Sequence, residues 1–137
     1  MSPEELCELH HAAFDYPRPW TALEFASILD QPTVFLVSIG KGFLIARVLA
    51  DETELLTLAV PIAERRRGIG KTLVQEFLAE ASHRGAETAF LEVAADNGPA
   101  RALYGATGWD TAGMRSGYYR KRDGTLVDAL IMRRGVP

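Results

Sequence analysis

The N-terminal residues carry apolar side chains at helical spacing behind a strong helix-start signal. Ser2-Pro3-Glu4-Glu5 combines an N-cap, a proline at the first helical position and the glutamate of a capping box, which predicts a helix from Pro3 to Phe14. A histidine on the flank of a helix is more often packed or solvated than catalytic, so we favour that interpretation for His10 and His11. The apolar face of this helix comprises Leu6, Leu9, His10, Ala13 and Phe14.

A second capping box follows a link that contains two prolines. Thr21 and Glu24 occupy its two key positions, and the short helix that they start is predicted to end near Leu29. Trp20 and Phe25 have the spacing of a hydrophobic staple, which fixes the angle at which the chain enters a helix.

Three runs with the composition of β-strands come next: Thr33 to Ile39, Phe43 to Ala50 and Thr53 to Val60. They are joined by Gly40-Lys41-Gly42 and by Asp51-Glu52. Because such short turns connect antiparallel neighbours, the three runs are predicted to form an antiparallel meander.

A second amphipathic helix is predicted from Gly68 to His83, and Gly85 is placed to end it in a left-handed conformation. The strand Thr88 to Ala94 follows and should lie parallel to Thr53 to Val60, with the helix as the right-handed crossover between them. The apolar side of the helix comprises Ile69, Leu73, Phe77, Leu78 and Ala81.

The C-terminal part predicts one more helix and two strands. Pro99 opens a helix that ends near Gly108. The strands Trp109 to Met114 and Leu126 to Met132 follow, around a loop that contains Tyr118-Tyr119-Arg120. The expected class is therefore α/β, of the α+β type, with about four helices and a mixed, mostly antiparallel central sheet.

The 137 residues, 47% hydrophobic and 24% charged, suffice for one domain with a real core and are too few for two, so a single domain over 1–137 is expected. The formal net charge of −3 disfavours nucleic-acid binding and is compatible with a basic peptide or an amine. No apolar run reaches the ~20 residues of a membrane span, and no signal peptide is evident, so a cytoplasmic protein is expected. Cys7 cannot form an internal disulfide, and three histidines make no metal-ligand cluster.

The stretch Arg65-Arg66-Arg67-Gly68-Ile69-Gly70-Lys71 lies between a predicted strand and a predicted helix. A Walker A loop would need glycine in place of Arg65, and a dinucleotide fingerprint would need glycine in place of Leu73, so both are excluded. Two glycines one residue apart let the backbone approach a ligand, and the free N–H groups at a helix start attract anions. The stretch predicts a pyrophosphate-binding turn, with a solvated basic cluster as the alternative.

The pattern Arg-x-x-Gly-x-Gly over residues 65–70 resembles the coenzyme A pyrophosphate loop of the GNAT (Gcn5-related) N-acetyltransferases. The order of elements extends the resemblance over nearly the whole chain, as does the block Leu91-Glu92-Val93-x-x-x-Asn97-x-x-Ala100-x-x-Leu103-Tyr104-x-x-x-Gly108-Trp109. With Tyr118-Tyr119 and Asp128-Ala129-Leu130-Ile131-Met132 after it, the chain looks most like the ribosomal-protein-alanine N-acetyltransferases of the RimI type.

This resemblance implies the GNAT fold, acetyl-coenzyme A (acetyl-CoA) as donor, a protein N-terminal peptide as acceptor, and a monomer or homodimer. It places the donor where the two parallel strands splay apart, and the rule that open sheets bind ligands beyond the carboxyl ends of parallel strands indicates the same place. The backbone N–H of Val60 would contact the thioester carbonyl, and Asn97 would bind the pantetheine arm as well as cap a helix. The implied donor site comprises Leu58, Val60, Arg65, Arg66, Arg67, Gly68, Ile69, Gly70, Lys71, Thr72, Asn97, Ala100 and Tyr104.

Two residues are candidates for proton transfer. Glu92 is a lone carboxylate in the apolar strand Ala89 to Ala94, a costly position unless the side chain faces a cleft or a partner. We interpret it as the general base, acting directly or through water, rather than as a solvent-facing strand residue. Tyr104 resembles the tyrosine that protonates the coenzyme thiolate, and its alternative is an ordinary core aromatic.

The pKa values of the possible acceptor amines narrow the choice of acceptor. Deprotonating lysine at neutral pH costs roughly 3 to 4 kcal/mol more than deprotonating an α-amine, because their unperturbed pKa values are about 10.4 and 7.7 to 8.0. A single glutamate, Glu92, is better matched to the α-amine. Trp20 and Tyr118-Tyr119 lie in the segments that flank the acceptor groove in GNAT enzymes, and helix capping and strand packing are their alternatives.

Two other functions compete with this one. A GNAT enzyme for a small amine is possible on the same fold, and a non-catalytic coenzyme-binding module is the other rival. The presence of both Glu92 and Tyr104 argues against the second rival.

Three departures from the family pattern stand out. Pro61-Ile62 replaces the usual Asp-Pro, and Trp109 replaces the common phenylalanine. The chain also starts at its first helix, so the first strand of the family is expected to be absent and the sheet to end at Thr33 to Ile39. Such an edge would be shielded by the N-terminal segment, blunted by twist, or paired with a second copy.

Overall fold

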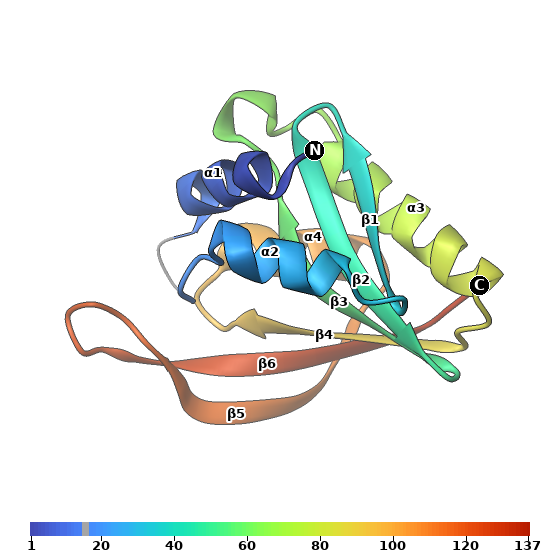
Figure 1. Cartoon of the computed structure of the whole chain (residues 1–137). Coiled ribbons are helices and arrows are strands. Elements are labelled where there is room, and N and C mark those ends of the chain that lie inside the picture. Colours follow the sequence, from blue (N-terminus) through green and yellow to red (C-terminus); the bar gives the residue numbers. More distant parts are fainter. Residues whose placement is uncertain (15–16) are drawn as a thin grey trace.

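Figure 1 shows the computed structural model, which describes residues 1–14 and 17–137. Among the described residues, none of the helices has both the length and the apolar character of a membrane span. In chain order the elements are α1 (Pro3–Ala13), α2 (Ala22–Leu29), β1 (Val34–Ile39), β2 (Gly42–Leu49), β3 (Glu52–Ala59), the 3-10 turn η1 (Ile62–Glu64), α3 (Ile69–His83), β4 (Thr88–Ala94), α4 (Gly98–Ala106), β5 (Asp110–Arg120) and β6 (Leu126–Gly135).

The strands form one sheet in the order β1-β2-β3-β4-β6-β5. Only β3 and β4 are parallel within this sheet, and α3 connects them (Figure 1). The predicted meander and the predicted mixed, mostly antiparallel sheet are therefore confirmed. The expected edge is confirmed as well, because β1 lies at the border of a sheet that has six strands within the described residues.

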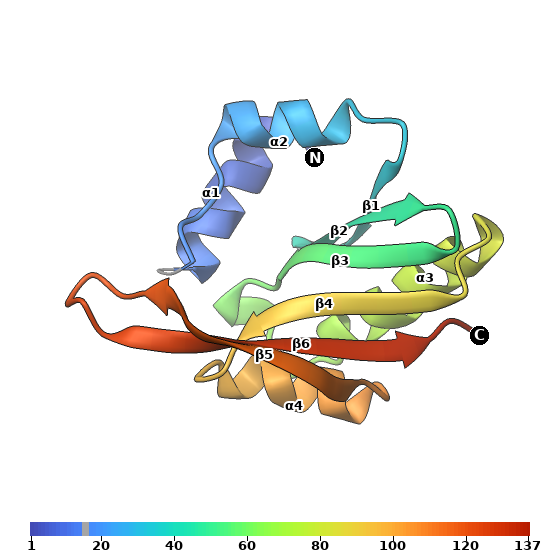
Figure 2. The same cartoon turned by 90° about the horizontal axis from the view of Figure 1, so that it is seen from below.

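Helices cover both faces of the sheet, α1 and α2 on one side and α3 and α4 on the other (Figure 2). Each face buries its own apolar cluster, so the sheet has a core on both sides. The α3/α4 side includes Leu73, Phe77, Leu91, Tyr104 and Trp109. The α1/α2 side includes Leu6, Phe25, Val34, Phe43, Ile45 and Ala59.

The parallel strands pair only over their first halves. Their register runs from Glu52 opposite Thr88 to Leu55 opposite Leu91 and stops there, although β3 continues to Ala59 and β4 to Ala94. Beyond this point β3 stays paired with β2, and β4 stays paired with β6. The predicted splay of the parallel pair is thus present, and the two strands separate toward their C-terminal ends (Figure 2).

Both predicted capping boxes form. Ser2 and Glu5 bond reciprocally at the start of α1, and Thr21 and Glu24 do the same at the start of α2. These starts are set by local hydrogen bonds, which explains why sequence spacing alone predicts them.

Two predicted strand ends are wrong: β5 runs past Met114, and β6 runs past Met132 to Gly135. Tyr118 and Tyr119 lie in β5 and not in a loop, because the strand continues to Arg120 with Tyr119 opposite Val127. The register shifts between Arg115 and Tyr119, and Gly117 takes a left-handed conformation there, with φ of +56°. The Gly117 N–H donates to Asp128 Oδ1 at 2.8 Å, which secures the bulge. The connection between β5 and β6 is therefore shorter than expected.

His10 anchors α1 to the sheet, which confirms its interpretation as a packed residue. Its side chain is 3% exposed, and Phe14, Trp20 and Phe25 surround the ring. The Trp20 backbone N–H donates to His10 Nδ1 at 2.9 Å, so Nδ1 is an acceptor and Nε2 carries the proton that it donates to Thr57 Oγ1, also at 2.9 Å. Burial, with a smaller contribution from His11, lowers the pKa of His10 to about 4, so the neutral ring is the stable form.

The His10 contacts predict a stability loss in mild acid. The unfolded ring binds its proton near pH 6.5 and the folded ring only near pH 4, so the unfolded state holds more protons in this window and the free energy of unfolding falls as pH falls through it. We expect wild type to lose about 2 kcal/mol more than His10→Gln between pH 7 and pH 4.5, as measured by urea unfolding. His83→Gln, which replaces an exposed histidine on α3, is the matched control and should follow wild type. Parallel curves for wild type and His10→Gln would contradict this role.

Candidate active site

The turn between β3 and α3 presents unpaired backbone donors. Gly68 is the N-cap of α3 and has a left-handed conformation with φ of +74°, and no side chain caps the helix. The first helical bond runs from the Thr72 N–H to the Gly68 carbonyl at 3.0 Å. Within the described residues, the N–H groups of Gly68, Ile69, Gly70 and Lys71 donate to no other group, so the positive end of the helix is open to an anion.

The two glycines of this turn serve different purposes. A side chain at Gly68 would meet no protein atom within 4 Å, so that position faces open space. A Cβ at Gly70 would lie 3.2 Å from Leu103 Cδ2, so Gly70 lets α3 pack closely against α4. Gly68 therefore provides access for a ligand, and Gly70 provides close helix packing.

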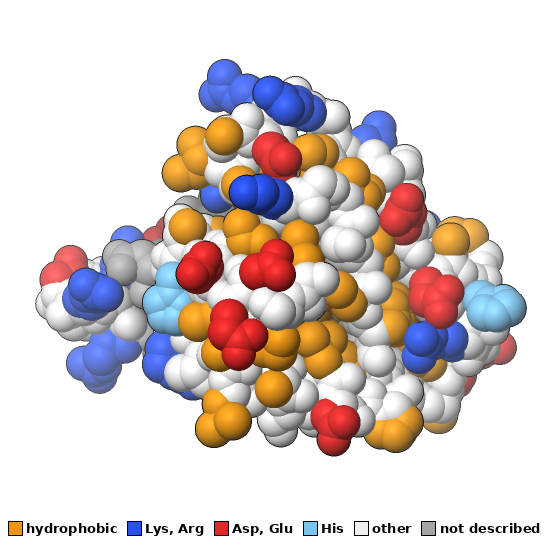
Figure 3. Space-filling view, turned by 45° about the horizontal axis from the view of Figure 1, so that its top comes forward, with side chains coloured by type: hydrophobic (Ala, Val, Ile, Leu, Met, Phe, Trp, Pro, Cys, Tyr) orange, Lys and Arg blue, Asp and Glu red, His pale blue; other side chains and the backbone are white. Residues whose placement is uncertain are grey.

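Basic side chains surround the same turn. Arg66, Arg67 and Lys71 are exposed, and Figure 3 shows Lys and Arg side chains gathered at this end of the molecule. Arg65 differs because its Nε donates to the Val60 carbonyl at 3.0 Å and so ties the turn to the end of β3. This contact is not predictable from sequence spacing. The turn combines a positive surface with open amides, the arrangement that binds pyrophosphate.

The remaining candidate donor residues lie at or just beyond the end of β3 and at the start of α4. Leu58 and Val60 are half-buried and pack against the core on the α3/α4 side. The Ala100 N–H donates to Asn97 Oδ1 at 3.2 Å, so Asn97 caps α4 as one of its two expected roles requires. Its amide nitrogen and the other lone pair of Oδ1 can still bind a ligand.

Tyr104 lies on α4 and is 6% exposed. Its ring packs edge-on against Trp109, with centroids 5.9 Å apart. Within the described residues, the only fully buried side-chain N or O atom without a hydrogen-bond partner is Trp109 Nε1, so the Tyr104 hydroxyl, which also forms no bond, keeps contact with solvent. Burial raises the pKa of Tyr104, and the side chain is therefore a phenol that can donate a proton.

Glu92 lies on β4 opposite Ile131. Its side chain is 28% exposed, and Arg115 Nε lies 3.3 Å from Oε1. The Tyr119 hydroxyl donates to Oε2 at 3.4 Å. Burial and the negative charge of Glu92 raise the pKa of Tyr119, which keeps this donor protonated. The carboxylate is thus oriented by two partners from β5.

A hollow of about 230 Å³ opens beside Glu92. Tyr118, which is 51% exposed, forms one wall with its ring edge-on to Tyr119, and the Arg115 guanidinium lies 5.2 Å from the Tyr118 centroid. A second carboxylate, Glu54, is paired with Arg47 at 3.0 Å. The hollow is lined by Glu54, Phe90, Leu91, Glu92, Arg115, Tyr118 and Ile131.

The structure brings most of the predicted acceptor residues together, with one exception. Glu92, Tyr118 and Tyr119 lie side by side, whereas Trp20 packs against His10 and Phe25 in the apolar cluster under α1 and α2. The staple interpretation therefore accounts for Trp20. The sequence did not indicate Arg115, and only its position on β5, between Gly113 and Gly117, could have suggested that it faces the same side as the tyrosines.

Glu92 and Tyr104 belong to opposite sides of the sheet. Tyr104 is part of the core on the α3/α4 side, whereas Glu92 faces the hollow on the other side. Beyond Leu55 and Leu91, β3 and β4 are no longer hydrogen-bonded to each other. The gap between them therefore connects the two faces of the sheet. A group lying in this gap would have Tyr104 on one side and Glu92 on the other.

Known proteins are similar to this chain in sequence and in fold. A family model described as the acetyltransferase (GNAT) family matches residues 4–109. The [Ribosomal protein bS18]-alanine N-acetyltransferase of Escherichia coli strain K12 is 37% identical over 118 residues, which cover 83% of this chain and 79% of that enzyme.

Solved structures agree with the sequence comparison. The crystal structure of the ribosomal-protein-S18-alanine N-acetyltransferase from Escherichia coli superimposes with a TM-score of 0.85 at 32% identity and covers 98% of this chain and 87% of its own. Arabidopsis thaliana NAA60 in complex with acetyl-CoA gives a TM-score of 0.81 at 20% identity, over 98% of this chain and 93% of its own. At that identity, the second match shows the shared fold alone.

Proposed function

This chain belongs to the acetyltransferase (GNAT) family, and on that premise we propose that it transfers an acetyl group from acetyl-CoA to the α-amine of a protein N-terminus. The observation that carries the proposal is the carboxylate of Glu92, held by Arg115 and Tyr119 at the wall of an aromatic-lined hollow. A ribosomal protein is the acceptor class we propose, because the 37% identical relative is named for the alanine of ribosomal protein bS18. Such an acceptor implies a cytoplasmic enzyme.

The residues around the splay fit the donor. The open amides from Gly68 to Lys71 and the exposed Arg66 and Arg67 would hold the pyrophosphate, and the space at Gly68 admits it without a clash. Leu58, Val60, Asn97 and Ala100 would line the pantetheine arm, with Thr72 beside the pyrophosphate. Acetyl-CoA supplies an activated thioester carbonyl when bound. No metal is needed for this chemistry, because the amides and basic side chains supply the positive charge.

The two proton transfers fall to different side chains. Glu92 accepts the proton that the amine loses, directly or through one water, and the contact with Arg115 orients its carboxylate. Tyr104 donates a proton to the departing sulfur, since its buried phenol stays protonated at neutral pH. Because a phenol can donate a proton and a carboxylate can accept one, the two side chains have different roles and neither can replace the other.

The hollow suits an extended chain end. Tyr118 offers a flat wall, and the residues that line the hollow come from the strands β3, β4, β5 and β6, with no helix residue among them. One partly exposed carboxylate removes a proton from an α-amine far more readily than from lysine, a difference of roughly 3 to 4 kcal/mol at neutral pH. These two features favour an N-terminal peptide over a lysine side chain.

A screen with isotope-labelled acetyl-CoA tests the acceptor class. We expect label on the α-amine of N-terminal peptides, identified by mass spectrometry. The matched control is the same peptide with its α-amine blocked and a lysine left free, which should stay unlabelled. Preferential labelling of lysine peptides or of small amines such as polyamines would contradict the proposed acceptor.

The pyrophosphate turn is tested by Gly68→Val. The valine side chain would fill the space reserved for the ligand, so calorimetry should show coenzyme A affinity lowered at least about tenfold in a folded protein. Gly85→Val is the matched control, because Gly85 also has a left-handed φ, of +92°, and no neighbour within 4 Å, at the other end of α3. Both changes carry a strain of about 1–2 kcal/mol, and only the first should weaken binding. Equal affinities in the two variants would remove the turn from the donor site.

The proton roles are tested by the pH dependence of turnover with a saturating N-terminal peptide. Glu92→Gln should lower kcat about 10²-fold near pH 6.5 and less as the pH rises, because the amine then loses its proton unaided. Tyr104→Phe should lower kcat by a factor that stays constant with pH, since the acceptor's ionisation is unchanged, and its coenzyme affinity should stay near wild type.

Glu54→Gln is the matched control for charge in the hollow. It removes a second carboxylate from the same lining and should leave the shape of the pH profile unaltered. Parallel profiles for Glu92→Gln and Tyr104→Phe, or full activity in either, would overturn the assignment.

A further inference from the structure

The outer edge of β1 offers unpaired backbone groups. The Val48 N–H donates to the Thr33 carbonyl at 2.9 Å, and Thr33 stands directly opposite Val48 by extension of the register. Because bonded and non-bonded pairs alternate in an antiparallel ladder, the backbone groups of Val34, Leu36 and Ser38 point away from β2. The Val34 N–H is satisfied by the Gln31 carbonyl at 3.1 Å, which leaves its carbonyl and both groups of Leu36 and Ser38 at the edge.

This edge has none of the usual protection against strand pairing. The strand Val34–Ile39 reads VFLVSI, so it contains no proline, no lysine and no other charged residue. Leu36 is only half-buried. An apolar edge of this kind is stable in water when something covers it.

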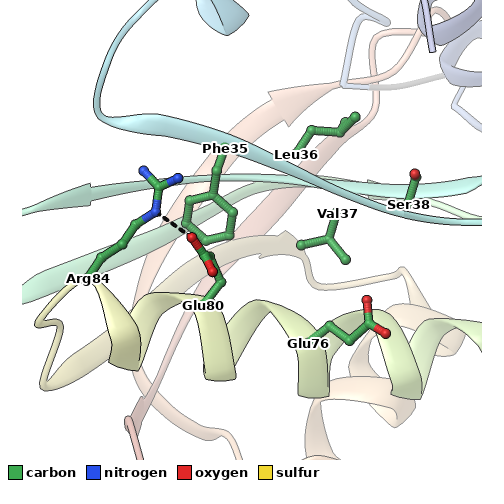
Figure 4. A pocket seen from close by; sticks show the side chains of 7 residues that line it. All are labelled: Phe35, Leu36, Val37, Ser38, Glu76, Glu80 and Arg84. Carbon is green, nitrogen blue, oxygen red and sulfur yellow. Dashed lines mark hydrogen bonds and ion pairs between the residues drawn. The ribbon is translucent and has the colours of Figure 1, made fainter.

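A hollow of about 360 Å³ runs between this edge and α3 (Figure 4). Phe35 and Val37 point toward the helix, and Arg84 lies beside Phe35 with its guanidinium 4.6 Å from the ring centroid. Glu80 pairs with Arg84 at 2.9 Å, and Glu76 lies near the other end, by Val37 and Ser38. The hollow is lined by Phe35, Leu36, Val37, Ser38, Glu76, Glu80 and Arg84.

We propose that this edge binds a second copy of the chain, with the two β1 strands antiparallel about a two-fold axis at Leu36. Only this register places Leu36 opposite Leu36 and Val34 opposite Ser38 of the second copy, so that all edge groups lie within the overlap. Leu36 then exchanges two N–H···O bonds with its counterpart, and each Ser38 N–H donates to a Val34 carbonyl, which adds two more. The dimer would join two sheets into one.

The charges of α3 are self-complementary in this arrangement. The axis brings Phe35 opposite Val37 of the second copy, so Arg84, which lies beside Phe35, faces Glu76, which lies near Val37. The same pair forms again on the other side of the axis. Glu80, already neutralised by Arg84 of its own chain, lies near the centre. The charged residues of α3 are thus complementary to the same residues of a second copy related by a two-fold axis. This self-complementarity favours a second copy over an unrelated peptide.

Charge complementation tests the proposal. Sedimentation equilibrium of wild type, from about 1 μM to about 1 mM chain, should give twice the 15.0 kDa chain mass at the upper end. Glu76→Arg and Arg84→Glu each create two like-charge pairs and should raise the dissociation constant about tenfold or more. An equimolar mixture of the two variants restores opposite charges in both pairs and should dimerise as wild type does. Glu8→Arg, on α1, is the control for charge reversal and should not change the dissociation constant.

A backbone variant provides a second test. Ser38→Pro removes an N–H that points outward, so the β1–β2 ladder is kept while the intermolecular bond is lost. Its matched control is Ser38→Ala, which keeps the N–H and should dimerise. Thermal unfolding monitored by circular dichroism establishes that each variant is folded. A wild type that stays monomeric at about 1 mM, or a mixture of the charge variants that stays monomeric when wild type dimerises, would overturn the proposal.

Discussion

The candidate site depends on the point at which the parallel pairing between β3 and β4 ends. Each strand has an antiparallel partner on its outer side, β2 for β3 and β6 for β4, and each keeps that partner to its end. The parallel pairing between them lasts only to Leu55 and Leu91. Because both outer ladders are retained, the sheet opens at one place without unravelling, and the inner backbone groups of the two strands face a gap. A buried backbone group needs a partner, so such a gap is suited to a ligand that can form hydrogen bonds.

The gap also explains how the proposed acid and the proposed base can lie apart in one small domain. Tyr104 belongs to the apolar core between the sheet and α4, where burial keeps the phenol protonated. Glu92 belongs to the opposite face, where Arg115 and the Tyr119 hydroxyl contact its carboxyl group. The sheet itself separates the two environments, and the splay joins them at the position where a thioester and an amine would meet. The two proposed proton roles thus belong to opposite faces of one sheet.

The features that the sequence predicts correctly depend on residues close together in the chain. The features that it misses depend on the register between strands. The capping boxes at Ser2 and Thr21, the meander and the glycine turn before α3 depend on residues close in sequence, and all of them form. The bulge at Gly117 is not visible in the residue spacing, so the sequence predicts a loop for Tyr118 and Tyr119, whereas both lie in β5. The Arg115 contact with Glu92 joins β5 and β4, which are not neighbours in the sheet because β6 lies between them, and sequence spacing cannot reveal such a contact.

The anchoring of α1 ties the stability of the fold to this site. His10 bonds to Thr57, which lies on β3 beyond Leu55 and so belongs to the half of the strand that borders the gap. The N-terminal helices are therefore fixed to the segment that would line the donor. A proton on His10 puts an uncompensated charge against Phe25 and Phe43, and places a second donor against the Trp20 N–H. Loss of activity below pH 5 would then have two origins, a protonated amine acceptor and a β3 segment no longer supported by α1, and only the first should depend on Glu92.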